Sequence, residues 1–253
     1  MGRLQHKVAL VTGGASGLGA EISKQFVAQG ARVFMADINR EVGEAAAVEI
    51  GAGASFVRLD VTDEKNWQEC LQAVIAEAGK LDILVNNAGI LEFGNIEEAS
   101  LEQWERIHRV NGAGVFLGCK YGVATMKSHT DAGSIINVSS AVALKATSAT
   151  PAYSSSKALV QNLTCSVALH CGEKGYPIRC NSLHPGAIDT PMVRGDLHGE
   201  EAKAVMHRFD AAHPIGRTGT VEEIAAAAVF MASDESSFMT GAPMIIDGGN
   251  VIG

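Results

Sequence analysis

"KVALVTGGASGLGAEISKQFVAQG" (residues 7–30) contains the pattern that decides the fold of this chain. Residues 7–13 form a short apolar run that ends in glycine, which predicts a buried strand. Residues 18–30 carry apolar side chains at helical spacing and stop at Gly30, which predicts a helix. A strand, a glycine-rich turn and a helix in this order begin a β-α-β unit.

The same alternation continues to the end of the chain. Strands are predicted over 31–37, 55–61, 81–89, 133–140, 178–186 and 243–247, and helices over 39–50, 63–78, 100–127, 153–173 and 221–232. Strands separated by helices imply right-handed crossovers and a sheet covered on both faces. We therefore predict the α/β class: a single doubly wound, mostly parallel sheet of Rossmann type with helices on both faces. No linker interrupts the series, so residues 1–253 are expected to form one domain.

Composition excludes several classes of partner. The 253 residues carry a formal net charge of -8 and no run of Lys or Arg, which argues against nucleic acid. The longest early apolar run, Val8–Val11, is too short for a signal peptide or a membrane span. Five cysteines without paired spacing, and scattered histidines, argue against disulfides and a metal site. We expect a cytoplasmic protein.

The glycine-rich turn "TGGASGLG" (12–19) has the residues that a phosphate-binding loop needs. Glycine permits a tight turn and lets the backbone approach a pyrophosphate, which the free N–H groups at a helix N-terminus hold. A glycine-rich turn without a ligand is the alternative. The strand before the turn and the helix after it favour a dinucleotide. Its predicted contacts are Gly13, Ser16, Gly17, Leu18 and Gly19.

An acidic residue ends the second predicted strand. Asp37 lies 18 residues after Gly19, a spacing that suits a carboxylate bound to the adenosine ribose hydroxyls. Its charge would repel a 2′-phosphate, so NAD is preferred over NADP. Alternatively, Asp37 caps the helix that starts at Asn39, and nearby Arg40 weakens the preference.

Polar and small residues follow the next two predicted strands. Asp60 and Val61 follow the third strand, where the carboxylate suits an adenine amino group. Asn87, Ala88 and Gly89 follow the fourth, where small residues let a cofactor lie flat. Ordinary turn chemistry explains both groups equally well if no ligand is present.

Five motifs in this order and spacing resemble the short-chain dehydrogenase/reductase family over nearly the whole chain. They are T-G-x-x-x-G-x-G (12–19), N-N-A-G (86–89), Y-x-x-x-K (153–157), "HPGAIDT" (184–190) and "GAPMIIDGG" (241–249). The resemblance implies a catalytic tetrad of Asn111, Ser140, Tyr153 and Lys157, with Ser139 as the alternative serine. It also implies that Tyr153 is the acid/base, that Tyr153 and Lys157 contact the cofactor, and that Ser140 holds the substrate oxygen.

The resemblance further implies that a loop after the sixth strand holds the nicotinamide carboxamide. The matching residues are Pro185, Gly186, Ile188 and Thr190, which otherwise form a plain loop. Asn111 is expected to position water for proton relay.

The electrostatic energy of a nearby positive charge shows whether Tyr153 can act as a base. A free tyrosine has a pKa of about 10, so it is a poor base at neutral pH. A unit charge at ~4 Å and an effective dielectric of ~20 contributes on the order of 4 kcal/mol. Lys157 lies four residues on, on the same helix face. With the charge of oxidised nicotinamide, we expect the pKa of Tyr153 to approach about 7. Alternatively, the two residues are an ordinary pair on a solvated helix.

Two segments are expected to shape a substrate pocket: residues 141–150 and a lid over about 188–213. The lid offers apolar side chains at Met192, Val193, Leu197, Val205, Met206 and Phe209. The same spacing describes an amphipathic helix packed on its own domain.

Within this family the sequence looks most like bacterial NAD-dependent hydroxysteroid and secondary-alcohol dehydrogenases. It implies hydride transfer between NAD(H) and a hydrophobic secondary alcohol or ketone, such as a hydroxysteroid or an alicyclic or aromatic alcohol. A 3-oxoacyl-thioester reductase and a non-catalytic nicotinamide-binding regulator are the alternatives.

The family resemblance also implies a homotetramer. Its contacts would come from apolar residues on two predicted helices: Leu101, Trp104, Phe116, Leu117, Leu159, Leu163 and Val167. The same residues are consistent with plain core.

Overall fold

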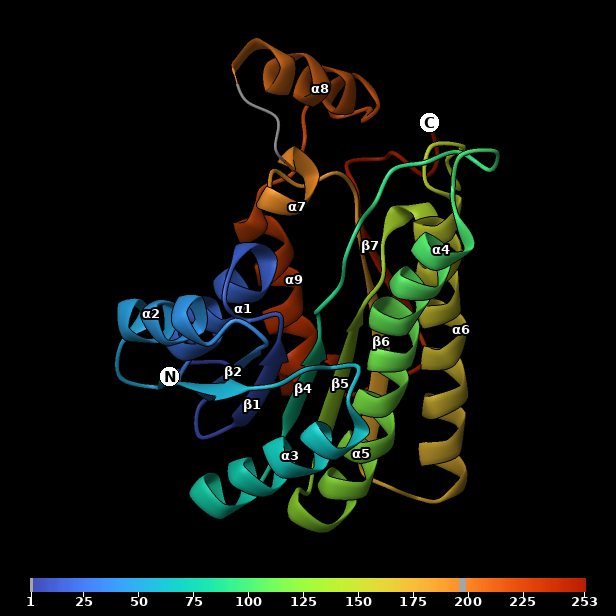
Figure 1. Cartoon of the computed structure of the whole chain (residues 1–253). Coiled ribbons are helices and arrows are strands. Elements are labelled where there is room, and N and C mark those ends of the chain that lie inside the picture. Colours follow the sequence, from blue (N-terminus) through green and yellow to red (C-terminus); the bar gives the residue numbers. More distant parts are fainter. Residues whose placement is uncertain (1, 196–198) are drawn as a thin grey trace.

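A computed structural model describes residues 2–195 and 199–253 (Figure 1). Seven parallel strands form one sheet in the order β3-β2-β1-β4-β5-β6-β7. The strands are β1 (Val8–Thr12), β2 (Arg32–Asp37), β3 (Ala54–Arg58), β4 (Ile83–Asn86), β5 (Gly133–Val138), β6 (Ile178–Pro185) and β7 (Pro243–Ile246). The predicted fold class, a doubly wound α/β sheet, is confirmed, and the sheet is parallel throughout.

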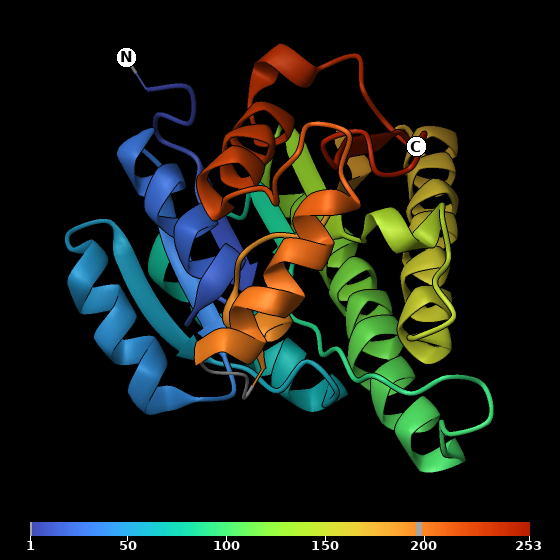
Figure 2. The same ribbon diagram turned by 90° about the horizontal axis from the view of Figure 1, so that it is seen from above.

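Helices cover both faces of this sheet (Figures 1 and 2). They are α1 (Gly17–Ala28), α2 (Arg40–Ile50), α3 (Glu64–Ala78), α4 (Leu101–His108), α5 (Gly114–His129), α6 (Pro151–Glu173), α7 (Pro191–Arg194), α8 (Gly199–Ala211) and α9 (Val221–Ala232). Helices α1, α2 and α9 pack on one face, and α3, α5 and α6 on the other.

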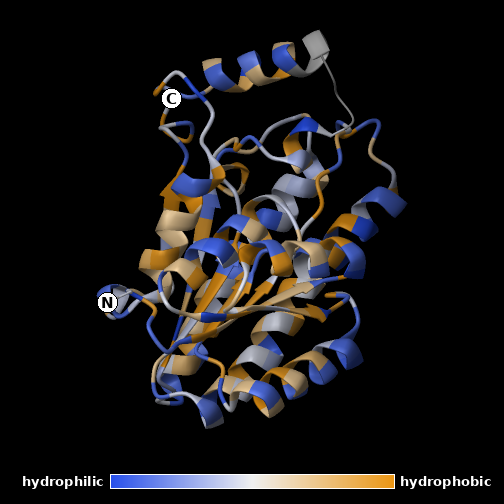
Figure 3. Cartoon of the chain, turned by 90° about the vertical axis from the view of Figure 1, so that its left-hand side faces the viewer, coloured by the Kyte–Doolittle hydropathy of each residue, from blue (hydrophilic) through white to orange (hydrophobic). Residues whose placement is uncertain are grey.

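The strands read as continuous apolar runs because both of their faces are buried. All five residues of β1 are buried, and their side chains alternate between two cores. Ala9 and Val11 belong to the core under α1 and α9, whereas Val8 and Leu10 belong to the core under α3 and α5. Figure 3 shows this division, with apolar colour concentrated in the strands and polar colour on the outer helix surfaces.

Two strands end three residues earlier than predicted, where side chains hold the chain in loops. β3 stops at Arg58, and the Asp60 carboxylate accepts hydrogen bonds from the backbone N–H and the hydroxyl of Thr62. β4 stops at Asn86, and the N–H of Asn87 donates to the Thr12 hydroxyl. The residues expected to bind a cofactor therefore lie in loops beyond the strand ends.

The helix predicted over 100–127 is interrupted in its middle. A π-helical turn, Arg109–Ala113, separates α4 from α5, so each residue there is displaced from regular α-helical spacing. Such turns in α-helices are frequent at functional sites. Asn111 lies within this turn.

The predicted lid segment contains two helices, α7 and α8. Helix α8 stands away from the body of the molecule (Figure 1). Its apolar residues Val205, Met206 and Phe209 are half-buried. Leu197, also expected in the lid, lies outside the described residues. Over residues 2–195 and 199–253, none of the helices is both long and apolar enough to cross a membrane.

Candidate active site

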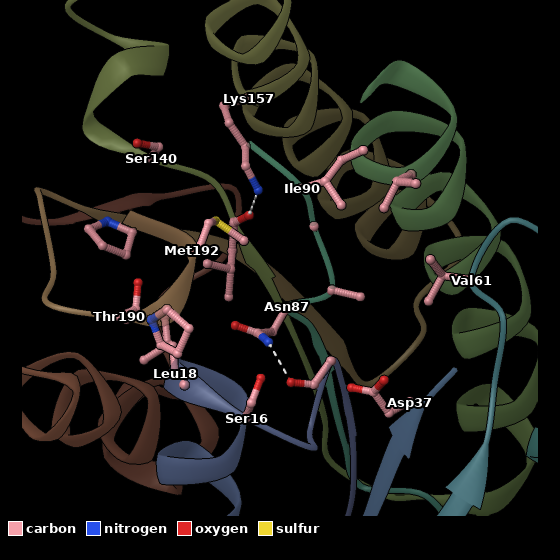
Figure 4. Close-up of a pocket in the computed structure, with 18 of the residues that line it drawn as sticks. Ser16, Leu18, Asp37, Val61, Asn87, Ile90, Ser140, Lys157, Thr190 and Met192 are labelled. Atoms are coloured by element: carbon pink, nitrogen blue, oxygen red, sulfur yellow. Dashed lines mark hydrogen bonds between the residues drawn. The ribbon is translucent and has the colours of Figure 1, made fainter. Parts of the chain in front are cut away.

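A cavity of about 390 Å³ opens at the carboxyl ends of the strands, around the point where the strand order reverses between β1 and β4 (Figure 4). Ligands of doubly wound sheets bind at this point. The predicted site residues that line it are Gly13, Ser16, Gly17, Leu18, Asp37, Asp60, Val61, Asn87, Ala88, Gly89, Ser140, Tyr153, Lys157, Pro185, Gly186, Ile188 and Thr190. Gly19 and Asn111 do not line it.

The glycine loop is shaped by close backbone contacts. Gly13 and Gly17 have φ angles of +63° and +52°, which side-chain-bearing residues rarely adopt. A Cβ atom on Gly19 would lie 2.1 Å from the Gly13 carbonyl oxygen. Gly19 therefore allows the loop to fold tightly behind the cavity.

The N-terminus of α1 fits a phosphate group. Ser16 is its N-cap residue and makes no side-chain capping hydrogen bond, whereas side chains cap α2, α3, α4 and α9. Among the described residues, no side chain therefore competes for the first N–H groups of α1. A helix N-terminus of this kind binds a pyrophosphate through its N–H groups and its dipole.

Asn87 ties the glycine loop to the loop after β4. Its side-chain amide donates to the carbonyl oxygens of Thr12, at 2.9 Å, and Gly13, at 3.3 Å. The Thr12 hydroxyl in turn accepts from the N–H groups of Asn87 and Ala88. Figure 4 shows the Asn87 side chain directed at the glycine loop. Asn87 thus shapes the cavity wall as well as lining it.

Asp37 ends β2 and braces the glycine loop. One carboxylate oxygen accepts from Ala15 N at 3.2 Å, and the other accepts from Asn39 N at 3.0 Å. The cap of α2 is Asn39, whose side chain accepts from Val42 N. Arg40 forms an exposed ion pair with Glu44. Asp37 therefore presents its carboxylate to the cavity and is not the cap of α2.

Ser140, Tyr153 and Lys157 meet at the other end of the cavity. Lys157 is buried, and its ammonium group donates to the Val138 carbonyl oxygen at 2.9 Å and lies 5.6 Å from the centre of the Tyr153 ring. Ser140 is hydrogen-bonded to Tyr153. The Ser139 hydroxyl donates instead to the Lys157 carbonyl oxygen at 2.8 Å. Both serines line the cavity, but the hydroxyl that interacts with Tyr153 is that of Ser140.

Burial dominates the titration of this site. It raises the pKa of Tyr153 to about 12, and the hydrogen bond with Ser140 acts in the opposite direction. Burial also lowers the pKa of Lys157 to about 8. The expected pKa near 7 applies to the enzyme with oxidised nicotinamide bound and stays a prediction, whereas in the protein without cofactor the cost of removing water from the phenolate dominates.

Asn111 lies behind the cavity. It is fully buried; its side-chain oxygen accepts from Ile90 N at 2.8 Å, and its amide donates to Ile90 O and to the Ser156 hydroxyl. A Cβ atom on Gly89 would lie 3.1 Å from this oxygen and 3.5 Å from the Lys157 ammonium. Asn111 therefore joins the π turn to the loop after β4 and to α6.

Apolar side chains complete the wall beside the serine and tyrosine. Met192 and Val193, expected from the lid, are joined by Ile90, Val110 and Pro191. Pro191 lies in the segment predicted as the lid, but Ile90 and Val110 were not predicted from the sequence. Ile90 directly follows the N-N-A-G motif, so its place in the cavity wall could have been predicted from that motif. The place of Val110 could not have been predicted, because the direction of its side chain depends on the π turn.

Comparison with known proteins places the chain among dehydrogenases and reductases. A family model described as enoyl-(acyl carrier protein) reductase matches residues 13–250. A 3-beta-hydroxysteroid dehydrogenase of Comamonas testosteroni is 43% identical over 97% of this chain and 96% of its own length. A 3-alpha-(or 20-beta)-hydroxysteroid dehydrogenase of Mycobacterium bovis is 44% identical over 100% of this chain and 92% of its own length.

A third relative bears on the cofactor. An NADP-dependent (R)-specific alcohol dehydrogenase of Lentilactobacillus kefiri is 39% identical over 98% of this chain and 97% of its own length. Similar proteins therefore include at least one that is named for NADP. Given the full-length matches, the sheet order and the cavity, the chain belongs to the short-chain dehydrogenase/reductase family.

Proposed function

We propose that this protein is an NAD-dependent dehydrogenase of hydrophobic secondary alcohols, with hydroxysteroids as the leading substrate class and alicyclic or aromatic alcohols next. The observation that carries the proposal is the shared cavity. Ser140, Tyr153 and Lys157 lie at one end of it, and the glycine loop and Asp37 lie at the other. This arrangement suits an alcohol held beside a dinucleotide.

The chemistry of the cavity wall supports a hydrophobic substrate. Ile90, Met192 and Val193 line the cavity together with the catalytic residues. Burying apolar surface there stabilises a bound steroid or cyclic alcohol by roughly 25 cal/mol per Å². The names of the two hydroxysteroid dehydrogenases among the relatives point to the same class.

Each catalytic residue has a role that its geometry supports. When bound, the nicotinamide ring supplies the chemistry of hydride transfer, which belongs to the cofactor. Tyr153 takes the alcohol proton during oxidation and returns it during reduction. Ser140 donates a hydrogen bond to the substrate oxygen, where negative charge develops. Lys157 favours the phenolate form of Tyr153 through its charge.

Asn111 supports these groups without touching the cavity. By holding Ile90 at both its N–H and its carbonyl, it fixes the loop that faces the substrate. A further role in relaying the proton to solvent is consistent with its place behind Gly89 and Lys157.

A spectrophotometric screen tests the proposal. Formation of reduced nicotinamide is followed with NAD and with NADP on 3- and 20-hydroxysteroids, cyclohexanol and 1-phenylethanol. We expect turnover of at least one of these alcohols, faster with NAD. Tyr153→Phe is expected to lower kcat by roughly 10²- to 10⁴-fold, because general acid–base catalysis contributes about that much.

The screen also separates the rival functions. Activity confined to 3-oxoacyl thioesters would replace the proposal with a thioester reductase. Tight binding of reduced nicotinamide without turnover of any alcohol or ketone would indicate a regulator.

We also propose a homotetramer in a reducing compartment, the cytoplasm. All five cysteines are free thiols, which fits a reduced setting. The exposed apolar side chains on α4, α5 and α6 supply a surface for assembly.

A further inference from the structure

A buried histidine contacts the backbone of the catalytic serine. His184, on β6, has no exposed surface. Its Nδ1 atom lies 3.0 Å from the Ser140 carbonyl oxygen, and its Nε2 atom lies 2.8 Å from the hydroxyl of Ser182, which is also buried. The motif "HPGAIDT" contains this residue, but the role expected for that segment was to hold the nicotinamide carboxamide.

The two contacts determine where the ring carries its proton. A carbonyl oxygen only accepts, so Nδ1 bears the hydrogen and donates to Ser140. Nε2 then accepts from the Ser182 hydroxyl. Burial and the charge of Lys157 lower the pKa of His184, while the hydrogen bond to Ser140 raises it. A buried, neutral ring with both nitrogens satisfied acts as a fixed support and not as an acid or a base.

Ser140 needs such a support because it lies where the chain leaves the sheet. The last backbone hydrogen bond between β5 and β6 runs from Ser139 N to Leu183 O, at 2.8 Å. Ser140 follows in an extended conformation, φ −167° and ψ 159°, and a single 3₁₀ turn begins after it. Its hydroxyl accepts from Val142 N at a long 3.3 Å. The imidazole thus provides the contact from β6 to the backbone of this residue.

We propose that His184 is a positioning residue for catalysis: by holding the Ser140 carbonyl, it sets the direction of the Ser140 hydroxyl toward Tyr153 and the substrate oxygen. The inference rests on the proposed function. A misplacement of about 1 Å can lower a rate by up to ~10²-fold, so the support should be visible in kcat.

Three substitutions separate the two contacts of the ring. The amide nitrogen of His184→Asn lies near the place of Nδ1 and can still donate to Ser140. His184→Gln reaches instead toward the place of Nε2, and His184→Ala removes both contacts. We expect kcat to fall roughly 10- to 100-fold in the Gln and Ala variants and less than about threefold in the Asn variant. The Kd for NADH, measured by fluorescence, should stay unchanged in all three.

A double-mutant cycle distinguishes positioning from a general loss of structure. If His184 acts through the serine hydroxyl, His184→Ala should lower kcat in the wild type but add almost nothing in a Ser140→Ala background. Additive losses would overturn the inference. So would an Asn variant as slow as the Gln variant, or an Ala variant with wild-type kcat. If the Ala variant does not fold, the comparison of Asn with Gln decides.

Hydrogen exchange tests the placement of Ser140 without any turnover. Its hydroxyl accepts from Val142 N–H, so exchange at Val142 should be faster in His184→Gln than in the wild type and near wild type in His184→Asn. Equal exchange in all variants would overturn the inference. An absence of turnover in the wild type would overturn only the proposed function, because this measurement does not depend on activity.

Discussion

At the scale of single residues, burial and charge act against one another on Tyr153. Burial, partly opposed by the hydrogen bond with Ser140, raises the pKa of Tyr153 to about 12, which makes it a poor base at any physiological pH. The Lys157 ammonium lies 5.6 Å from the centre of the ring, and a unit charge at such a separation and an effective dielectric of ~20 contributes about 3 kcal/mol in favour of the phenolate. In the proposed mechanism the charge of Lys157 offsets part of the desolvation cost, and a bound oxidised nicotinamide would add to this effect.

The pH dependence of catalysis follows from this opposition. Alcohol oxidation needs the phenolate of Tyr153, so kcat should rise with pH and level off above the pKa in the loaded enzyme; ketone reduction needs the phenol and should fall with pH. Lys157→Met should move both profiles at least about one pH unit upward, because removing the ammonium raises the pKa of Tyr153. Profiles at saturating NAD measure this, with Lys157→Arg as the charge-preserving control. An unmoved profile in the Met variant would contradict the role of the charge.

The proposed preference for NAD is expected to depend on Asp37. Its two oxygens accept from Ala15 N and Asn39 N, so Asp37→Asn keeps one acceptor for these groups while removing the charge. The ratio of kcat/KM for NAD to that for NADP should fall at least about tenfold, because like charges oppose each other at several kcal/mol in a binding site. Initial rates with both cofactors give the ratio, and Glu44→Gln serves as a charge control on α2. An unchanged ratio would mean that another residue sets the preference.

At the scale of elements, the turn between β1 and α1 depends on the absence of side chains. A Cβ atom on Gly19 would lie 2.1 Å from the Gly13 carbonyl oxygen and 2.6 Å from the Asn87 amide, so Gly19→Ala must displace the loop. We expect the Kd for NADH to rise at least roughly 100-fold, since the N–H groups of α1 no longer align with the pyrophosphate. Isothermal titration calorimetry measures it.

Gly172 provides the matched control for this substitution. It lies in α6, and a Cβ atom there meets nothing within 4 Å. Gly172→Ala should leave the Kd for NADH unchanged and stabilise the fold by about 0.5–1 kcal/mol, because alanine loses less backbone entropy in a helix. If Gly19→Ala binds NADH as tightly as Gly172→Ala does, the loop is not the pyrophosphate site.

How far the sequence predicts these elements depends on the range of the interactions that form them. β1 and α1 could be predicted from the sequence, because an apolar run, a glycine turn and a helical period are local signals. The start of α6 at Pro151, two residues before the predicted one, also has a local cause, since proline suits the first helical position. The π turn at Arg109–Ala113 has no local signal of this kind, so the sequence did not predict it.

The same limit applies to the candidate site. Its glycines, Asp37, Ser140, Tyr153 and Lys157 follow from motifs at the ends of predicted elements. The raised pKa of Tyr153 does not, because it depends on what several segments together bury. The contact of His184 with Ser140 could not be predicted from the sequence either, because the pairing of β5 with β6 brings together residues 44 apart in the chain.

At the scale of the whole molecule, α4, α5 and α6 lie next to one another on one side (Figure 1). Apolar side chains on these helices remain exposed. Leu101, Trp104, Phe116 and Leu159 expose 72%, 40%, 50% and 41% of their surface. The other three residues considered for assembly, Leu117, Leu163 and Val167, pack against the core of the chain itself. In the proposed tetramer, the same surface of a second copy of the chain covers these exposed side chains.

The proposed assembly predicts the mass of the particle in solution. Light scattering after size exclusion should give close to four times the 26.4 kDa of one chain. Phe116→Asp combined with Leu159→Asp should split the tetramer, because each carboxylate would be buried without a partner at a cost of several kcal/mol. Val48→Asp is the control: Val48 is 82% exposed on α2, on the opposite side of the sheet, and should leave the mass unchanged. A wild-type mass near 26 kDa, or a double variant that stays tetrameric, would show that the exposed face of α4, α5 and α6 is not the interface.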